Sequence, residues 1–190
     1  MTFSLAHFRF GVRRPVFLGW LYSGLCLLLL NAEVTKEYQI KAAFLYNFTK
    51  FVEWPAARFA DDASPIVIGV VGPNPFEDEL AKLVNGRKAN GRNIVVMHLS
   101  SIPESGSVHV LFFSAGETRP LGDMLARFHA AGVLTVGESP HFKAAGGMIN
   151  FVPEADKIRF EINQSASEQA GLKISAQLLK LATAVHKKSS

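Results

Sequence analysis

The chain alternates between stretches whose apolar residues recur every three or four positions and stretches that are continuously apolar. The first periodic stretch begins at Thr35, and its apolar residues would share one face of a helix: Ile40, Phe44, Phe48, Phe51 and Val52. Pro55 would end this helix, because proline cannot continue the helical hydrogen bonding. The pattern therefore predicts an amphipathic helix from Thr35 towards Pro55, with an aromatic face.

Continuous apolar runs follow the helix and predict strands at Ile66–Val71, Asn93–Leu99, Val108–Ser114 and within "GVLTVGE" (132–138). The run Ile66–Val71 is too apolar to be half-exposed, so we expect a strand buried on both faces, and we expect buried strands at the next two runs as well. Asn74 and Pro75 are a favoured cap and first-turn pair, and they predict a short helix that runs through Glu79 and Leu83. Another amphipathic helix is marked by Leu121, Leu125 and Phe128. Strands that alternate with helices indicate an α/β domain with a mostly parallel sheet flanked by helices.

The last third of the sequence changes character. "GGMINFVP" and "KIRFEIN" are separated by "EAD", which predicts an antiparallel hairpin near the C-terminus, with one wet face on its second arm. Ser165 and Glu168 form a capping box, but Gly171 interrupts the helix that they would start. Either one helix continues through the glycine, or "LKIS" forms a short strand and Ser175 caps a second helix. We favour the second arrangement.

The N-terminus has the layout of a secretory signal. Its three arginines and no acids precede the apolar run Val16–Leu30, which is shorter than the roughly 20 residues that span a bilayer comfortably. We expect a signal peptide over 1–32, followed by one exported α/β domain over 33–190 of periplasmic location. An uncleaved membrane anchor is the alternative. The only cysteine, Cys26, lies in this apolar run, so an exported domain would depend on its core rather than on disulfides.

The overall charge gives no support for a nucleic-acid surface. The formal net charge is +4, but removing the three N-terminal arginines leaves 17 basic and 16 acidic residues. No later run of Lys or Arg with interleaved aromatic residues occurs. The sequence therefore predicts a partner other than a nucleic acid.

Residues that could carry chemistry are few. Gly72 and Asn74 follow the first predicted strand, and Glu138, Ser139 and His141 follow the strand "GVLTVGE", so they would lie near the carboxyl edge of the sheet, where α/β folds commonly bind ligands. A loop whose glycines permit a tight turn is the competing interpretation of the second segment. The nucleotide-binding glycine patterns and the nucleophile elbow GxSxG do not occur. The sequence thus predicts no catalytic residues and no cofactor, with a small ligand as an open alternative.

The histidines do not form a metal site. Those at positions 98, 109, 129, 141 and 186 are scattered singly, and no HExxH pattern accompanies them. His98 and His109 lie within predicted apolar strands, so we expect them to be satisfied histidines of the core. The sequence therefore predicts no metal.

Five segments together resemble the YfiR family of exported bacterial proteins. They are "KAAFLYNFTKFVEWP", "IVIGVVGPNPF", "VHVLFF", "TVGESPHFKAAGGMINFV" and "IRFEINQSASEQAGLKISAQLLKLA". The resemblance implies a periplasmic α/β domain, often a homodimer, without catalytic activity of its own. It also implies restraint of a membrane-bound diguanylate cyclase of the YfiN type, which lowers cyclic-di-GMP signalling and biofilm formation. The best known members carry disulfides that make repression redox-sensitive, a route that a chain without cysteine after Cys26 does not have.

Two functions from different classes follow. In the first, the chain is a regulator that docks on an inner-membrane sensor protein of the diguanylate cyclase type. Tyr46, Glu53 and Trp54 are the candidate partner-binding residues, because they fall off the expected apolar face or at the helix end, where amphipathic aromatic residues often mark an interface. For Trp54 we favour the competing interpretation, in which it closes the core beside Pro55. In the second, the chain is a small-ligand-binding module associated with a TonB-dependent receptor or a sensor kinase.

Overall fold

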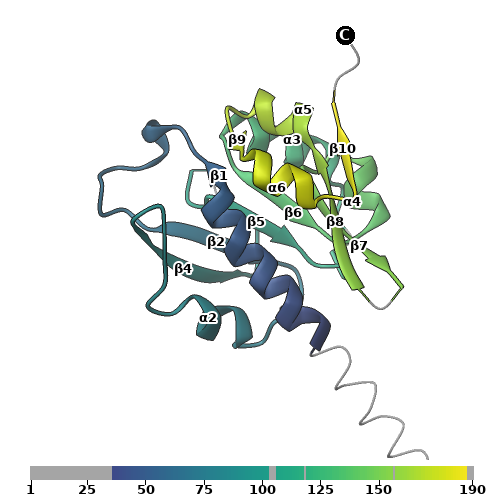
Figure 1. The fold of residues 1–190 in the computed structure, drawn as a ribbon, viewed down its shortest axis with the longest axis horizontal. Helices are drawn as coiled ribbons and strands as arrows, with labels where there is room; N and C mark the ends of the chain where they lie inside the picture. Colours follow the sequence, from purple (N-terminus) through teal and green to yellow (C-terminus); the bar gives the residue numbers. More distant parts are fainter. Residues whose placement is uncertain (1–35, 103–105, 118, 156, 188–190) are drawn as a thin grey trace, which may run out of the picture. The chain divides into compact units, whose positions relative to one another are not determined.

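The structure is a computed structural model that describes residues 36–102, 106–117, 119–155 and 157–187, and Figure 1 shows its fold. The expected signal segment, 1–32, lies outside these residues. The described part begins with a helix over 36–51, here named the N-terminal helix. No helix among the described residues combines the length and the apolarity that crossing a bilayer would require.

The centre of the fold is an eight-stranded sheet. Its strands lie in the order β10-β8-β7-β6-β5-β2-β4-β3. In chain order they are β2 Ile66–Val71, β3 Lys88–Ala89, β4 Arg92–Leu99, β5 Val110–Phe113, β6 Leu134–Gly137, β7 Ile149–Glu154, β8 Lys157–Asn163 and β10 Ala184–His186. Neighbouring strands run parallel except for the pairs β7–β8 and β3–β4. A separate antiparallel pair joins β1 Val52–Glu53 to β9 Lys173–Ile174.

Helices cover both faces of this sheet. They are the short 3-10 helix η1 Ala56–Arg58, α2 Glu79–Val84, α3 Gly122–Ala130, α4 Pro140–Ala144, α5 Gln164–Gln169 and α6 Ala176–Leu181. The N-terminal helix crosses one face together with α2 and α6, and α3 and α4 lie on the other face (Figure 1). Strand β5 is buried between the two layers, because Val110 and Phe112 join one apolar cluster while Leu111 and Phe113 join the other.

The predicted α/β class with a sheet of mixed strand direction is confirmed, and the predicted strand directions match in part. The expected antiparallel hairpin is β7–β8, with the register Ile149↔Ile162 to Glu154↔Lys157, so Glu154, expected in the connection, is instead the last paired residue of β7. Antiparallel pairing also occurs at β1–β9 and β3–β4, which the sequence pattern did not indicate. Both additional pairs involve strands of two residues, too short to produce an alternating pattern.

The predicted end of the N-terminal helix was wrong, and so was part of its buried face. The helix ends at Phe51, and Val52–Glu53 forms β1, because these two residues pair with β9 far along the chain. Ile40, expected in the core, is 37% exposed. Phe48 and Val52 are buried as expected, and the buried face also includes Leu45 and the charged residue Lys41.

The prediction that β4 is a buried strand was also wrong. Val95 and Met97 are each 43% exposed, and His98 is exposed as well, so it is not a core histidine. The physical reason is the position of β4 near an edge of the sheet, where α2 contacts it and neither α3 nor α4 covers its second face. His109, by contrast, is buried as expected.

Two helix caps differ from the sequence interpretation. Asn74 closes a turn through the Phe76 N–H and the Glu77 carbonyl, and α2 begins only at Glu79. The first C-terminal helix, α5, is capped by Asn163 rather than by Ser165, because the Asn163 side chain accepts the Ala166 N–H. The preferred arrangement of the tail is confirmed, since "LKIS" contains β9 and Ser175 caps α6.

Candidate functional site

The carboxyl ends of β2, β5 and β6 meet at one edge of the sheet, as parallel strands require. A polar cluster around Glu138, the residue that follows β6, lies at this edge. Glu138 accepts hydrogen bonds from the Ala115 N–H at 2.7 Å and from the Tyr38 O–H at 3.1 Å, and its other oxygen lies 2.5 Å from the Lys41 Nζ. Lys41 also pairs with Glu37 one turn earlier on the N-terminal helix. The cluster therefore joins the N-terminal helix to the loops that follow β5 and β6.

The charges of this cluster are buried, which makes their pairing important. The Lys41 side chain is 6% exposed and the Glu138 side chain is 3% exposed. Burial, together with the charge and hydrogen bond of Glu138, raises the pKa of Tyr38 above its ordinary value. Tyr38 therefore keeps its proton and donates to Glu138. A buried carboxylate held by three donors fits a structural anchor.

The cavity beside Glu138 is small. It has a volume of about 160 Å³ and is lined by Glu37, Tyr38, Lys41, Ala115, Glu138, Phe151, Val152, Pro153 and Ile158. Ligand pockets commonly measure about 300–1,000 Å³, so this cavity suits a few water molecules better than a metabolite.

The other predicted ligand-binding residues do not line this cavity. Gly72 has a φ of +88°, and a Cβ there would lie 2.8 Å from the Ser114 Oγ, so the position requires glycine for a structural reason. Asn74 is engaged in its own turn, and Ser139 caps α4 by accepting the Phe142 N–H. His141 is exposed on α4. The hydrogen bonds of Asn74 and Ser139 are therefore those of a turn and of a helix cap.

A wider cavity lies at the opposite, amino edge of the sheet, and we name it the amino-edge groove. It has a volume of about 420 Å³ and is lined by Glu53, Trp54, Ala56, Phe59, Ile66, Asn90 and Arg92. The Arg92 guanidinium stacks over the Phe59 ring at 3.8 Å, and the Trp54 Nε1–H donates to the His109 carbonyl at 3.2 Å. The groove thus has two anchored aromatic rings, one cation and one exposed carboxylate, Glu53.

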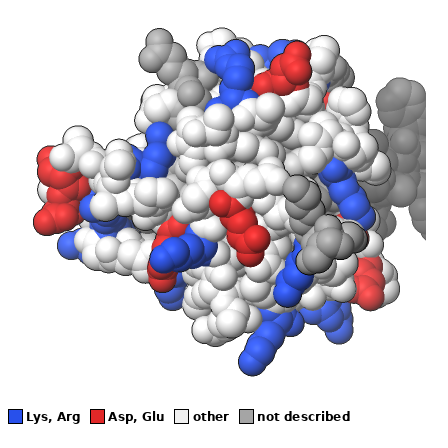
Figure 2. All heavy atoms as spheres, turned by 90° about the horizontal axis from the view of Figure 1, so that it is seen from above, with Lys and Arg blue, Asp and Glu red and all other residues white. Residues whose placement is uncertain are grey.

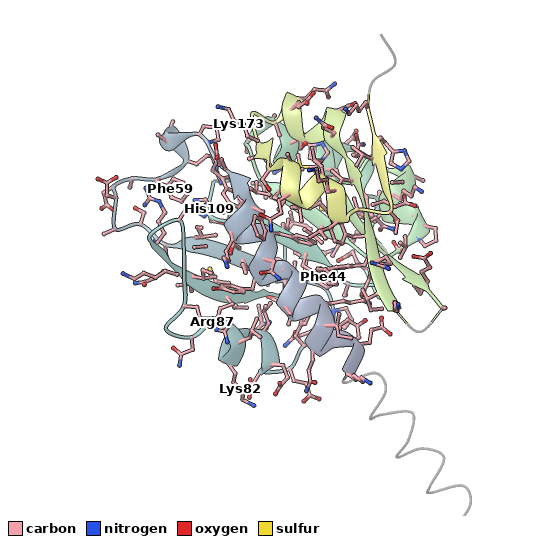
Figure 3. The ribbon with its side chains drawn as sticks, viewed as in Figure 1. Phe44, Phe59, Lys82, Arg87, His109 and Lys173 are labelled. Atoms are coloured by element: carbon pink, nitrogen blue, oxygen red, sulfur yellow. The ribbon has the colours of Figure 1, made fainter. Side chains whose placement is uncertain are left out.

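His109 supports this groove from behind. Its ring stacks on Phe59 with centroids 4.6 Å apart, its Nδ1 lies 3.1 Å from the Val67 N–H, and its Nε2 lies 3.2 Å from the Arg58 carbonyl. These partners assign a neutral ring that accepts at Nδ1 and donates at Nε2. Burial lowers the pKa of His109 to about 4, with the neighbouring charges of Arg58 and Arg92 acting in the same direction. The ring therefore stays neutral and holds Phe59 in place (Figure 3).

Glu53 and Trp54 come together in the groove, whereas Tyr46, the third predicted partner-binding residue, does not line it. Tyr46 lies between two cations, with Lys50 at 5.5 Å and Arg87 at 5.3 Å from its ring. Sequence reasoning missed Phe59 and Arg92. The available signal was Asn90-Gly91, a dipeptide typical of a tight hairpin, which turns β3 into β4 and brings Arg92 to the groove.

The described surface carries mixed charge. Figure 2 shows acidic and basic side chains interspersed on the face it views, with uncharged areas between them. Within residues 36–102, 106–117, 119–155 and 157–187, no three His, Cys, Asp or Glu side chains are placed to hold a metal ion. The groove and the buried cluster are therefore the candidate sites that we consider on the described part of the chain.

A comparison with curated proteins finds no match. Among solved structures, the chain is similar to a crystal structure of a conserved domain protein from Vibrio cholerae O1 biovar eltor, with 16% sequence identity and a TM-score of 0.44. The similarity covers 63% of this chain and 54% of that one, so this chain spans about half of its length. The likeness is too distant to bear on function.

A family model gives the informative match. The model described as YfiR/HmsC-like matches residues 38–183, a range that contains Tyr38, Lys41 and Glu138 of the buried cluster and the whole amino-edge groove. More than half of the chain is matched. The chain belongs to the YfiR/HmsC-like family.

Proposed function

We propose that this chain is a periplasmic regulatory protein that binds and restrains a membrane-bound signalling protein, with a diguanylate cyclase as the first candidate. The observation that carries the proposal is the family match over residues 38–183. At the level of the family, membership supports a periplasmic regulator of cyclic-di-GMP signalling that has no catalysis of its own. Restraint of the cyclase would lower cyclic-di-GMP and biofilm formation.

The amino-edge groove is the surface on which we place the partner. Trp54 and Phe59 are held in fixed orientations by His109, and ordered aromatic rings at the mouth of a cavity are typical anchors of protein interfaces. Arg92 already donates to the carbonyls of Asp61 and Ser64. Glu53 is exposed and therefore available to a cation. The groove fits a periplasmic segment that presents an apolar side chain beside a basic one.

Two experiments test this function. Deleting the gene should raise cellular cyclic-di-GMP, and an unchanged level would refute restraint of a cyclase. The exported chain should also recover an integral-membrane signalling protein from detergent-solubilised inner membranes. Glu53→Lys should weaken that recovery at least tenfold through charge reversal, whereas Glu168→Lys, an exposed acidic position on α5, should leave it unchanged. Equal recovery by both variants would remove the groove from the proposal.

A small-ligand-binding module is the second candidate, and the volume of the amino-edge groove favours it, because about 420 Å³ falls within the range of ligand pockets. In that case the partner would be a TonB-dependent receptor or a sensor kinase. The two candidates respond differently to mutation. Changing Trp54 should abolish partner binding if the chain is a docking protein, whereas a ligand module should lose only its response to the ligand.

A further inference from the structure

A small polar cavity lies where β7, β8 and β10 run side by side next to α4 (Figure 1). The strand register brings its side chains together, because Asn150 opposes Glu161 across β7–β8 and Asn163 opposes His186 across β8–β10. Opposed residues project from the same face of a sheet. Lys143 of α4 completes the lining, and the cavity has a volume of about 120 Å³. Three strands and a helix therefore hold its polar groups in place.

Asn150 lies deep in this cavity and has an unused acceptor. The residue is 6% exposed, and its Nδ2–H donates to the Phe151 carbonyl at 3.1 Å. A carbonyl can only accept, so this contact assigns the amide orientation. The Oδ1 is buried and accepts no hydrogen bond from any described residue, an arrangement that native structures rarely contain. It is therefore available to a donor on a ligand, unlike the Glu138 carboxylate, which already has three donors.

The charged groups lie nearer to the mouth of the cavity. The Glu161 side chain is 19% exposed, that of Lys143 46% and that of His186 52%. The Lys143 Nζ and the His186 Nε2 both contact the same carboxylate oxygen, Oε2, so neither engages Oε1. The hydrogen bond and the charge of Lys143 hold the pKa of Glu161 below its ordinary value, so this side chain is ionised. The mouth therefore combines a fixed anion with a solvated cation that can change its partner.

We propose that this cavity binds a small zwitterion, an amino acid of the size of glycine. Its ammonium group would donate to the Asn150 Oδ1 and to Glu161, and its carboxylate would pair with Lys143 at the mouth. A ligand with only a positive charge would be repelled by Lys143, and one with only a negative charge would be repelled by Glu161. A ligand that carries both charges, with its ammonium group innermost, matches the order of the groups in the cavity.

The volume of the cavity sets the size of the ligand. About 120 Å³ is the share of about four water molecules in the liquid. Glycine fits this space, whereas an amino acid with a long or aromatic side chain does not. The cavity shares no lining residue with the amino-edge groove. This inference therefore does not depend on the proposed regulatory function.

Titration calorimetry of the exported chain with glycine tests the ligand class, in phosphate buffer so that no buffer amine competes. Glycine should bind with a dissociation constant of about 1 mM or lower, since charge-assisted hydrogen bonds would hold both of its ends. N,N,N-trimethylglycine carries the same two charges but has no N–H to donate, so its affinity should be at least tenfold lower. The proposal is overturned if glycine shows no saturable binding, because the cavity would then hold water only. Equal affinity for the two compounds would overturn it as well.

Variants of the cavity test the site. Asn150→Leu keeps most of the side-chain volume but removes the acceptor, so it should weaken glycine binding at least tenfold. Its thermal midpoint should not fall, because no buried acceptor then lacks a donor. Glu161→Gln, at a less buried position, should also weaken binding at least tenfold, whereas Glu154→Gln, a 63% exposed carboxylate on the same hairpin, should leave it unchanged. If either Asn150→Leu or Glu161→Gln binds glycine as tightly as the parent chain, the proposal is wrong.

Discussion

Replacing Lys41 by methionine should destabilise the fold by an amount that the buried cluster allows us to work out. Methionine keeps most of the volume of lysine but leaves Glu138 without its counter-ion. Glu37 is 41% exposed and can be rehydrated, so the cost comes from Glu138, which is 3% exposed. Breaking a buried pair from one side costs about 3–5 kcal/mol. Because Ala115 and Tyr38 still donate to the carboxylate, we expect the lower end, about 3 kcal/mol.

A double variant separates this charge effect from lost packing. In Lys41→Met with Glu138→Gln, the neutral amide can still accept the Ala115 N–H, and no buried charge is left unpaired. We expect the double variant to lose only about 1–2 kcal/mol, which makes it more stable than the Lys41→Met single variant. A double variant that is more stable than the Lys41→Met single variant would show that the loss comes from the unpaired buried charge of Glu138.

Urea-induced unfolding followed by circular dichroism measures these differences, provided that the m-values agree. The control is Lys82→Met, because Lys82 is paired with Glu79 at 3.4 Å on the exposed surface of α2, and that change should cost less than about 0.5 kcal/mol. The reasoning would be refuted if Lys41→Met cost no more than the control. It would also be refuted if the double variant were the less stable of the two.

Three further predictions test the packing around the sheet. The free energy of unfolding should fall by up to about 3 kcal/mol as the pH is lowered from 6.5 to 4. The unfolded His109 binds a proton in this range, whereas the folded His109, with its pKa lowered to about 4, does not. The dependence of the unfolding free energy on pH should be weaker in His109→Gln, and an unchanged dependence would contradict a neutral buried ring. Ser175→Ala should cost about 1 kcal/mol by leaving the Leu178 N–H uncapped, and a loss below 0.3 kcal/mol in urea unfolding would contradict this. Gly147→Ala should cost about 1–3 kcal/mol, since its Cβ would overlap the Phe142 ring, and an unchanged thermal midpoint would show that the ring moves freely.

Strands and local caps were the most predictable parts of the fold, because their determinants are adjacent in sequence. The β-branched run Ile66–Val71 is β2 with the same bounds, and the Ser175 hydroxyl caps α6 as expected. The end of the N-terminal helix was not predictable in this way. Val52 fits the apolar period of the helix, but its pairing with Ile174, more than 100 residues away, converts it into a strand. Local periodicity carries no information about such a distant partner.

The candidate site could be predicted only in part, for a related reason. Trp54 and Glu53 were identified as marginal to the helix, and both line the groove. Arg92 reaches the same groove through the hairpin turn after β3, and it stacks on Phe59 of an irregular segment, a contact that no spacing rule encodes. For Lys41, nothing in the sequence indicated that the side chain is buried. A charged residue on a helix is expected in solvent, yet Glu138 compensates its burial from a loop 97 residues away.

The wrong prediction for β4 has its reason in the position of the strand in the sheet. A continuous apolar run is typical of a strand covered on both faces, and the sequence of β4 meets that criterion as well as β2 does. In the fold, however, Val95 and Met97 are exposed and the outer edge from Ile94 has no neighbouring strand among the described residues. The apolar run predicted burial because it reports local composition, whereas the exposure of Val95 and Met97 follows from the position of β4 near an edge of the sheet. Local and tertiary preferences therefore disagree at this strand, which marks its exposed face as a surface that the fold alone does not explain.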